Sequence, residues 1–482
     1  MRIAHVAAAG LILFACSGAD DLPEVEPYPQ CDASSTNLAS QAATYDAIAR
    51  RLHIQPGQNL LHAAITTSDY ETFDRVRLSD NSGFWTATYV ASQAYRYRVT
   101  GDAEALENLK RTLQGMLDLT RITGKPGLFG RSYVKLGLPG FPTEAELVAQ
   151  YPDCPDFSAG QCKRWNRVDD GPYAGHMWKN DVSRDEYAGH MFAVGIVGKL
   201  VDDAEVQDTA RAIASEVALH LIDNDMQFKD VSGETTTFGF MSPTSFGGFP
   251  GFLAVQTLAW FATAADLTQD PRITSFYRNC LLREDIEQCE KPDLATSESY
   301  LIHLRTMGLN LDCKTNWNNH NMAQLAMFDL LQTEEDGRTR RIYQQILEDQ
   351  MWAADDPRPM KDQKNTLYTF FHEVNRNPAL VERDEARVET GLCVLKKFPE
   401  VKYRRAVDHS RFTEQCRGRK DFGMSTELIP YEERLVDNFS WTRNPYQIRD
   451  PIEEDRTYIE SPEDFLLAYW MGRYFGMIDE DT

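Results

Sequence analysis

The sequence predicts an all-α protein built as an (α/α)6 toroid, a double ring of helical hairpins, with a minor β-hairpin. Long apolar helices alternate with amphipathic, charged ones, strand signals are few, and the last helix is as apolar as those in mid-chain. In an open superhelical solenoid, the competing arrangement, that last helix would be exposed to water. We therefore expect the ring to close.

The first residues of the sequence predict an export signal. An apolar run from Val6 to Phe14 follows an early arginine and is too short to span a bilayer permanently, which is typical of a signal peptide. The ending LFAC resembles a bacterial lipobox, in which Cys16 becomes the lipidated first residue; an ordinary signal cut near Ala15 is the alternative. We expect an outer-membrane or cell-surface lipoprotein, or otherwise a periplasmic or secreted protein, that meets the membrane only through this lipid.

The rest of the chain divides into a tether and one domain. Residues 16–37 are rich in Asp, Glu, Pro and Ser without a periodic apolar pattern, which predicts a flexible tether. Residues 38–482 show no second change in composition. Because one core of this size must grow by repetition, we expect them to form a single α/α-toroid catalytic domain.

Two types of helix alternate in this domain. Apolar and aromatic helices, predicted to be the buried inner ones, cover residues 84–99, 187–201, 252–267, 322–331, 367–374 and 465–477. Amphipathic helices with one wet face cover residues 43–52, 103–120, 204–221, 339–351 and 382–396. The best strand signal is 227–240, where DVSG predicts a hairpin turn.

Charge and motifs exclude several functions. The net charge is −23, and loss of Arg2 with the signal would make it −24, so neither nucleic acid nor an anionic membrane surface is expected as a partner. An acidic substrate stays possible, because a basic cleft can lie within an acidic shell. The sequence contains no P-loop, zinc-protease, serine-hydrolase or dinucleotide motif. We expect a monomer without a metal or other cofactor.

The cysteines fit an oxidising compartment. Beyond Cys16, eight remain, enough for four disulfides. Two pairs are close in sequence, and the other four cysteines can tie down the C-terminal connections, although sequence alone does not fix the pairing. The close pairs are Cys154 with Cys162 and Cys280 with Cys289; the others are Cys31, Cys313, Cys393 and Cys416.

A polar, aromatic-rich loop precedes each predicted inner helix. The loops cover residues 79–85, 177–186, 241–252, 315–321, 360–368 and 459–465. In a closed toroid the inner helices all begin at one end. These loops should therefore converge on one cleft, and this convergence predicts the functional site.

The loop at 177–186 allows two interpretations. Ser183 and Glu186 have the spacing of a capping box, which explains both residues fully. Asp181 lies ahead of this cap, between Lys179 and Arg184. Its carboxylate is expected either to be held ionised in the cleft or to form a surface salt bridge.

Two further acids and a histidine lie near the predicted helix starts. Asp80 is either an N-cap or the carboxylate of a sugar-binding rim, with Trp85 as a stacking face. Asp185 suits the positive end of the helix dipole. His190, one turn after Glu186, is either a core residue or a cleft residue.

The stretch TNWNNHN, residues 315–321, allows a different chemistry. Its asparagines can cap a helix and fill a turn. Alternatively, Asn319 neutralises a substrate carboxylate while His320 takes a proton, as β-elimination of a uronic acid requires. Tyr300 or Tyr368 would then be the partner acid.

The segments DNSGFWTATYVASQAYRYRVTGDAEALENLKRTLQGM, GLFGRSYV and WKNDVSRDEYAGHMF together resemble the first hairpins of six-hairpin, (α/α)6-toroid carbohydrate-active proteins, over roughly residues 80–225. This resemblance implies a glycan-degrading enzyme, a glycoside hydrolase or a polysaccharide lyase, that works where the inner helices end. NWNNHN is similar to the Asn-Asn-His stretch of toroid alginate lyases, which implies neutraliser and base roles for Asn319 and His320. Nothing after His320 matches that family closely.

We therefore expect a glycoside hydrolase acting on a poly- or oligosaccharide, with a uronate lyase or a non-catalytic glycan-binding lipoprotein as alternatives. Hydrolysis needs one carboxyl as acid and an ionised one as base or nucleophile. A binding protein would have the same aromatic rim, with its carboxylates paired by Lys or Arg. The candidate catalytic residues are Asp80, Asp181, Asp185 and His320, and the candidate substrate-binding residues are Trp85, Arg131, Trp178, Lys179, Arg184, His190, Trp317 and Asn319.

Overall fold

The computed structural model describes residues 37–151, 163–244, 249–294, 298–353, 358–436 and 438–480. The expected signal peptide, Cys16 and the tether up to residue 36 lie outside these ranges, as do Cys31, Cys154 and Cys162. In the part of the chain that is described, no helix is both long and apolar enough to cross a membrane.

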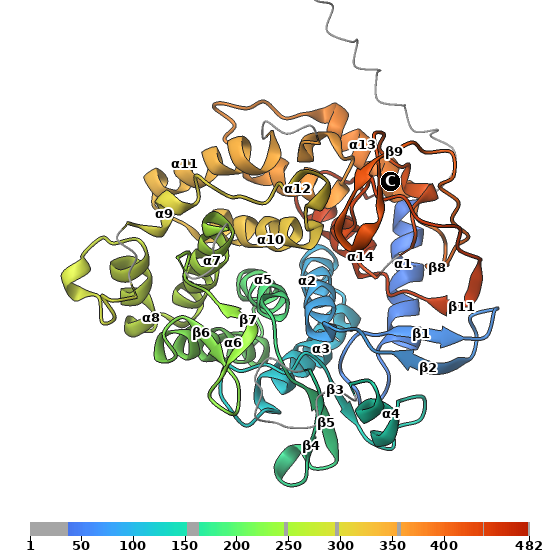
Figure 1. The fold of residues 1–482 in the computed structure, drawn as a ribbon, viewed down its shortest axis with the longest axis horizontal. Helices are drawn as coiled ribbons and strands as arrows, with labels where there is room; N and C mark the ends of the chain where they lie inside the picture. Colours follow the sequence, from blue (N-terminus) through green and yellow to red (C-terminus); the bar gives the residue numbers. More distant parts are fainter. Residues whose placement is uncertain are drawn as a thin grey trace, which may run out of the picture.

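Six helices of the described chain form a closed inner ring (Figure 1). Each helix contacts the next one along the chain, and the last, α14, returns to pack against the first, α2. The predicted closed toroid is therefore confirmed. The inner helices are α2 (Ser82–Thr100), α5 (Arg184–Leu200), α7 (Pro250–Thr268), α10 (Trp317–Thr333), α12 (Thr366–Asn375) and α14 (Glu463–Tyr474).

An outer layer of helices packs around this ring, and the main hydrophobic core lies between the two layers. Each outer helix packs against the ring: α1 contacts α14, α3 contacts α2, α6 contacts both α5 and α7, α8 contacts α7, α11 contacts α10 and α13 contacts α12. Their bounds are α1 (Leu38–Ile48), α3 (Ala103–Arg121), α6 (Ala204–Asp223), α8 (Pro271–Ser275), α11 (Gly337–Ile346) and α13 (Glu385–Lys396). The sequence did not predict α8, whose single turn is too short for a periodic pattern, nor the short helices α4 (Glu144–Ala149) and α9 (Tyr300–His303).

The turn between α2 and α3 shows how the sequence joins an inner helix to an outer one. Gly101 has φ 68°, the left-handed conformation that favours glycine, and its N–H donates to the carbonyl of Tyr97 at 2.8 Å to end α2. Asp102 then accepts a hydrogen bond from the N–H of Glu104 at 2.9 Å and caps α3. Two adjacent residues thus reverse the chain.

The described chain contains more β-structure than the sequence predicts. The expected hairpin is present: β6 (Gln227–Lys229) pairs with β7 (Thr235–Phe240), and Asp230 accepts from the N–H groups of Ser232 and Glu234 in the turn. Three more antiparallel sheets have the orders β2-β1-β11-β8, β3-β5-β4 and β10-β9. Their strands are β1 (Ala63–Thr66), β2 (Phe73–Arg77), β3 (Tyr133–Lys135), β4 (Trp165–Val168), β5 (His176–Lys179), β8 (Tyr403–Arg404), β9 (Glu414–Arg417), β10 (Gly423–Ser425) and β11 (Asp455–Ile459). Strands this short show no clear alternation, so periodicity did not reveal them.

The segment after α13 covers the starts of two inner helices. Lys402 forms a buried ion pair with Asp464 at 2.8 Å, at the start of α14. Trp441 donates its indole N–H to the carbonyl of Asp464 at 2.8 Å, and its own carbonyl accepts from Asn365, which caps α12, at 3.2 Å. The segment therefore closes one side of the ring entrance.

Two disulfides whose cysteines both lie in the described ranges fix connections outside the rings. Cys280–Cys289 closes a short loop after α8, which confirms one of the two close pairs. Cys313–Cys416 joins the chain just before α10 to strand β9. Both cysteines belong to the four that were expected to tie down the C-terminal connections, and their bond holds the C-terminal segment to the ring.

Candidate functional site

A cleft opens at the N-terminal ends of the inner helices. It consists of two adjoining hollows of about 610 and 440 Å³, to which the loops before α2, α5, α7 and α10 contribute. Among the described residues, none from the loops at 360–368 and 459–465 lines either hollow, because the C-terminal segment covers those two helix starts. The predicted convergence is therefore seen for four of the six loops. The residues shared by both hollows are Asp80, Asn81, Asn316, Asn318, Arg419 and Lys420.

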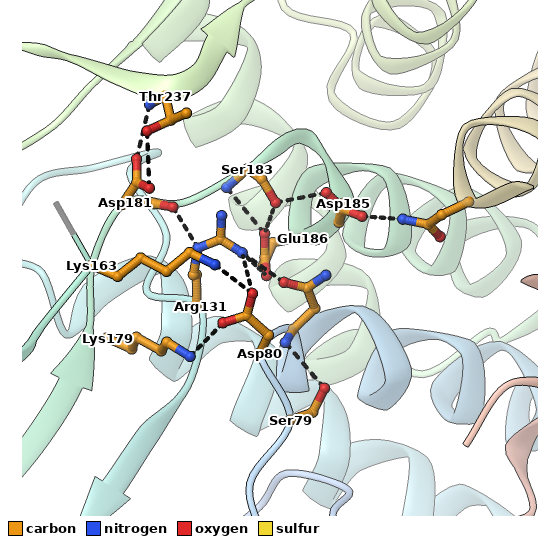
Figure 2. Close-up of polar contacts among 12 residues, drawn as sticks. Ser79, Asp80, Arg131, Lys163, Lys179, Asp181, Ser183, Asp185, Glu186 and Thr237 are labelled. Atoms are coloured by element: carbon orange, nitrogen blue, oxygen red, sulfur yellow. Dashed lines mark hydrogen bonds and ion pairs between the residues drawn. The ribbon is translucent and has the colours of Figure 1, made fainter. Parts of the chain in front are cut away.

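Asp80 lies at the centre of the cleft and is held by three cations (Figure 2). Its carboxylate is 2.5 Å from the Lys179 ammonium, 2.6 Å from that of Lys163 and 3.5 Å from the Arg131 guanidinium. Burial would raise the pKa of Asp80, but the charges of Lys179 and Arg131 and the hydrogen bond from Lys163 outweigh it and hold this pKa well below the ordinary carboxyl range. Asp80 is not the N-cap of α2, because Asn81 occupies that position.

Asp185 lines the same cleft from the first turn of α5 but is held by neutral groups. Ser183 donates its hydroxyl to one carboxylate oxygen at 2.7 Å, and the side-chain amide of Asn318, from α10, donates to the other. In the described part of the chain, no Lys or Arg forms an ion pair with Asp185. Asp80 and Asp185 thus present two carboxylates with different surroundings to one space.

The capping box predicted for α5 is present. The N–H of Ser183 donates to Glu186 at 3.2 Å, and the Ser183 hydroxyl donates to the same oxygen at 3.0 Å. Glu186 is fully buried, and burial raises its pKa to about 7, although Arg131 opposes this shift from 3.8 Å. The sequence identified the cap but gave no sign of the raised pKa.

Asp181 does not line the cleft. It adopts the left-handed conformation, with φ 53°, and its carboxylate points to β7, where it accepts from the N–H and hydroxyl of Thr237 at 2.9 and 3.1 Å (Figure 2). Burial raises its pKa and the Thr237 hydrogen bonds partly oppose the shift. The expected pairing with Lys179 or Arg184 is wrong: Lys179 pairs with Asp80, and Arg184 donates to the carbonyls of Phe238 and Phe240 at 3.3 Å.

Two other predicted binding residues are in the core. Trp178 is buried in β5 and packs against Leu60, Leu119 and Tyr133, so its indole presents no face to a sugar. His190 is fully buried, and burial lowers its pKa to about 4. Lys179 is also buried and acts on the cleft through Asp80. Trp85, Arg131, Arg184, Trp317 and Asn319 do line the cleft.

The residues proposed for β-elimination are only partly brought together. Asn319 lines the cleft and accepts from the amide of Asn316 at 3.0 Å. The half-buried ring of His320 stacks on Trp317 with 5.2 Å between centroids, and burial lowers its pKa to about 4. Tyr368 is buried and donates its hydroxyl to Asn321 at 3.0 Å, and Tyr300 is fully buried.

The structure adds residues that sequence reasoning missed. Of the described residues that line the two hollows, eight are Lys or Arg and two are Asp, in a chain whose net charge is −23. TNWNNHN had drawn attention to Asn316 and Asn318. No sequence motif marked the cations that were missed. They are Lys163, Lys314, Arg419, Lys420, Arg443 and Arg449.

The described side chains include no group of three or more His, Cys, Asp or Glu placed to hold a metal ion. The chemistry that the cleft can perform with its own groups is proton transfer and charge stabilisation, through Asp80, Asp185 and the surrounding cations.

Comparison with known proteins does not assign a family. No family model matches the chain, and no curated protein matches it. Among solved structures, the crystal structure of an unsaturated glucuronyl hydrolase specific for heparin is 11% identical, covers 66% of this chain and 85% of its own, and superposes with a TM-score of 0.24. Because this similarity is low, the fold described above rests on the helix contacts of this chain alone.

Proposed function

We propose that the protein is a glycoside hydrolase whose active site is the cleft at the starts of α2, α5, α7 and α10. One observation carries this proposal: Asp80 and Asp185 line the same cleft in contrasting environments. Glycoside hydrolysis uses two carboxyl groups, one that donates a proton to the leaving oxygen and one that stays ionised. Different surroundings give two carboxyl groups different pKa values, and this difference divides the two roles between them.

We assign the ionised role to Asp80 and the proton-donating role to Asp185. The cations around Asp80 keep it negative across the neutral range, which suits a nucleophile or a stabiliser of the positive charge that develops on the sugar ring. Among the described residues, Asp185 is bonded to a hydroxyl and an amide rather than to a cation, which distinguishes it from Asp80 and leaves the proton-donating role to it. Asn81, Asn316 and Asn319 supply amides for sugar hydroxyls.

The test is a paired assay on one set of neutral and acidic polysaccharides. Reducing ends and absorbance near 235 nm would be recorded together for the wild type and for Asp185→Asn. We expect reducing ends without absorbance, and a loss of about 10²- to 10⁴-fold in kcat for Asp185→Asn, the usual contribution of a general acid. Asp208→Asn is the matched control, because Asp208 is exposed on α6 and pairs only with Arg211 among the described residues.

Each other outcome contradicts one part of the proposal. Absorbance at 235 nm reports the unsaturated products of a lyase and would move attention to Asn319 and His320. Unchanged activity in Asp185→Asn would remove that residue from the mechanism. Absence of products with every glycan would favour a binding protein, whose carboxylates are paired by cations as Asp80 is.

A further inference from the structure

We propose that the cleft recognises a glycan bearing anionic groups, carboxylate or sulfate, and that the tip of the β9–β10 hairpin supplies the recognising cations. This inference rests on the proposed function and specifies its substrate class. The residues that carry it are Arg419 and Lys420, which line both hollows, together with Arg443 and Arg449, which line the smaller one. We call these four residues the basic wall.

Two of the four residues of the basic wall are not occupied by ion pairs within the described part of the chain. Arg419 and Lys420 are exposed, and neither forms an ion pair with any carboxylate in the described part of the chain. This differs from the opposite side of the cleft, where Lys163 and Lys179 are both bound to Asp80. Cations without a protein counter-ion, in a hollow of about 610 Å³, are available to an incoming anion.

The hairpin tip is held in place over the cleft. The disulfide Cys313–Cys416 fixes β9 to the turn before α10. Next to it, Lys314 donates to the carbonyl of Gly418 at 2.9 Å, and a Cβ on Gly418 would lie 3.0 Å from the carbonyl oxygen of Cys313. The two backbones thus pack closely, and Arg419 and Lys420, the next two residues, have a fixed position beside Asn316 and Asn318.

The backbone at the tip of the hairpin forms a closed turn. Lys420 and Asp421 both have positive φ, 55° and 59°, a conformation that costs free energy in residues other than glycine. Gly418 closes the turn by donating its N–H to the carbonyl of Phe422 at 2.7 Å. The guanidinium of the half-buried Arg449 lies 4.5 Å from the centre of the Phe422 ring, and both residues line the smaller hollow.

The charge of the whole molecule makes this cleft selective. A chain with net charge −23 repels polyanions over most of its surface, so an anionic glycan gains binding energy only where cations are concentrated. The cleft has this concentration of positive charge, because eight cations and two carboxylates line it among the described residues. Trp85 and Trp317 line the smaller hollow and can stack on sugar rings between the charged groups.

Binding to three dextrans that share one backbone tests the inference separately from hydrolysis. Neutral dextran, carboxymethyl-dextran and dextran sulfate would be compared by affinity electrophoresis with the full chain. We expect both charged dextrans, or one of them, to bind at least about tenfold more tightly than neutral dextran, and the preferred one identifies carboxylate or sulfate as the group read. Added salt should weaken this binding, because it screens the charges.

The decisive variant is Arg419→Gln/Lys420→Gln, which we expect to weaken binding of the charged dextran about tenfold or more. Arg338→Gln/Arg341→Gln removes the same charge from the exposed face of α11 and should leave binding within about twofold of the wild type. Equal binding of all three dextrans, no binding of either charged one, or unchanged binding in the first double variant would each overturn the inference. Hydrolysis of neutral glycans alone would overturn it too while leaving the proposed function intact.

Discussion

Glu186 is a buried acid next to the cleft residue Asp185, and the fold raises its pKa. Its Oε2 accepts two hydrogen bonds from Ser183, whereas no donor among the described residues bonds to its Oε1. Burial raises its pKa to about 7, from about 4.3 in an unfolded chain. Because the folded pKa is the higher one, the stability linked to this group is complete below about pH 4.3 and is lost as the pH rises through 7.

Replacement of Glu186 by Gln should therefore change the pH dependence of stability. Gln keeps the capping-box acceptor but cannot ionise. Relative to the wild type, Glu186→Gln should gain little at pH 4.5 and up to about 4 kcal/mol in free energy of unfolding at pH 8, since one pKa unit corresponds to about 1.4 kcal/mol. Urea unfolding at a series of pH values measures this difference. A difference that stays constant between pH 4.5 and 8 would contradict the assignment.

At the residue scale, the sequence could place those acids of the cleft that lie at the start of a predicted helix. Asp80 and Asp185 lie at helix starts, so the toroid alone brings them to the cleft. Asp181 was misplaced because its left-handed backbone turns the carboxylate to Thr237, which sequence spacing does not reveal. The basic wall was missed because Arg419 reaches the cleft through a disulfide that spans 103 residues.

At the scale of elements, α2 and α5 are held close together by glycines on both helices. A Cβ on Gly189 would lie 2.9 Å from the Cα of Phe84, and one on Gly83 would lie 2.8 Å from the ring of His190. This close approach places the starts of the two helices, and therefore Asp80 and Asp185, at one cleft.

Gly189→Ala should force α2 and α5 apart. The added methyl group meets backbone atoms that cannot rotate away, so we expect a loss of about 1 to 3 kcal/mol in free energy of unfolding, in the range of overpacked cores. Gly195→Ala, on the same helix, is the control, because its Cβ would meet Thr263 at 3.3 Å, a side chain that can adjust. Thermal unfolding compares the two. Equal effects would show that the α2–α5 contact is not a tight joint.

Helix type and helix ends were predictable because they depend on local signals. Every predicted inner helix is present, and Gly101 and Asp102 mark a turn where the sequence shows it. Strands β8 and β11 were not predictable, because each is stabilised by pairing with the other across some fifty residues rather than by its own pattern.

At the scale of the whole molecule, ring closure depends on a joint between the two ends of the domain. Asp46 on α1 accepts from the amide of Gln93 on α2 at 2.7 Å and from the indole of Trp470 on α14 at 3.2 Å. All three side chains are buried, so these hydrogen bonds are sheltered from water. The sequence predicted closure from the apolar character of the last helix, but not the polar network that fixes it.

Closure predicts that damage to the last helix spreads to the first. In an open solenoid each unit contacts only its neighbours in sequence, so Trp470→Ala would loosen α12 and α13 and spare α2. In the closed ring it should accelerate hydrogen exchange in α1 and α2 more than in α7, on the opposite side, because α14 packs against both α1 and α2. Trp352→Ala removes an equally buried indole from the turn after α11 and should not act preferentially on α2. If the Trp470→Ala protein exchanged no faster in α2 than in α7, the two ends of the domain would be independent, and the cleft would rest on the α2–α10 arc of the ring alone.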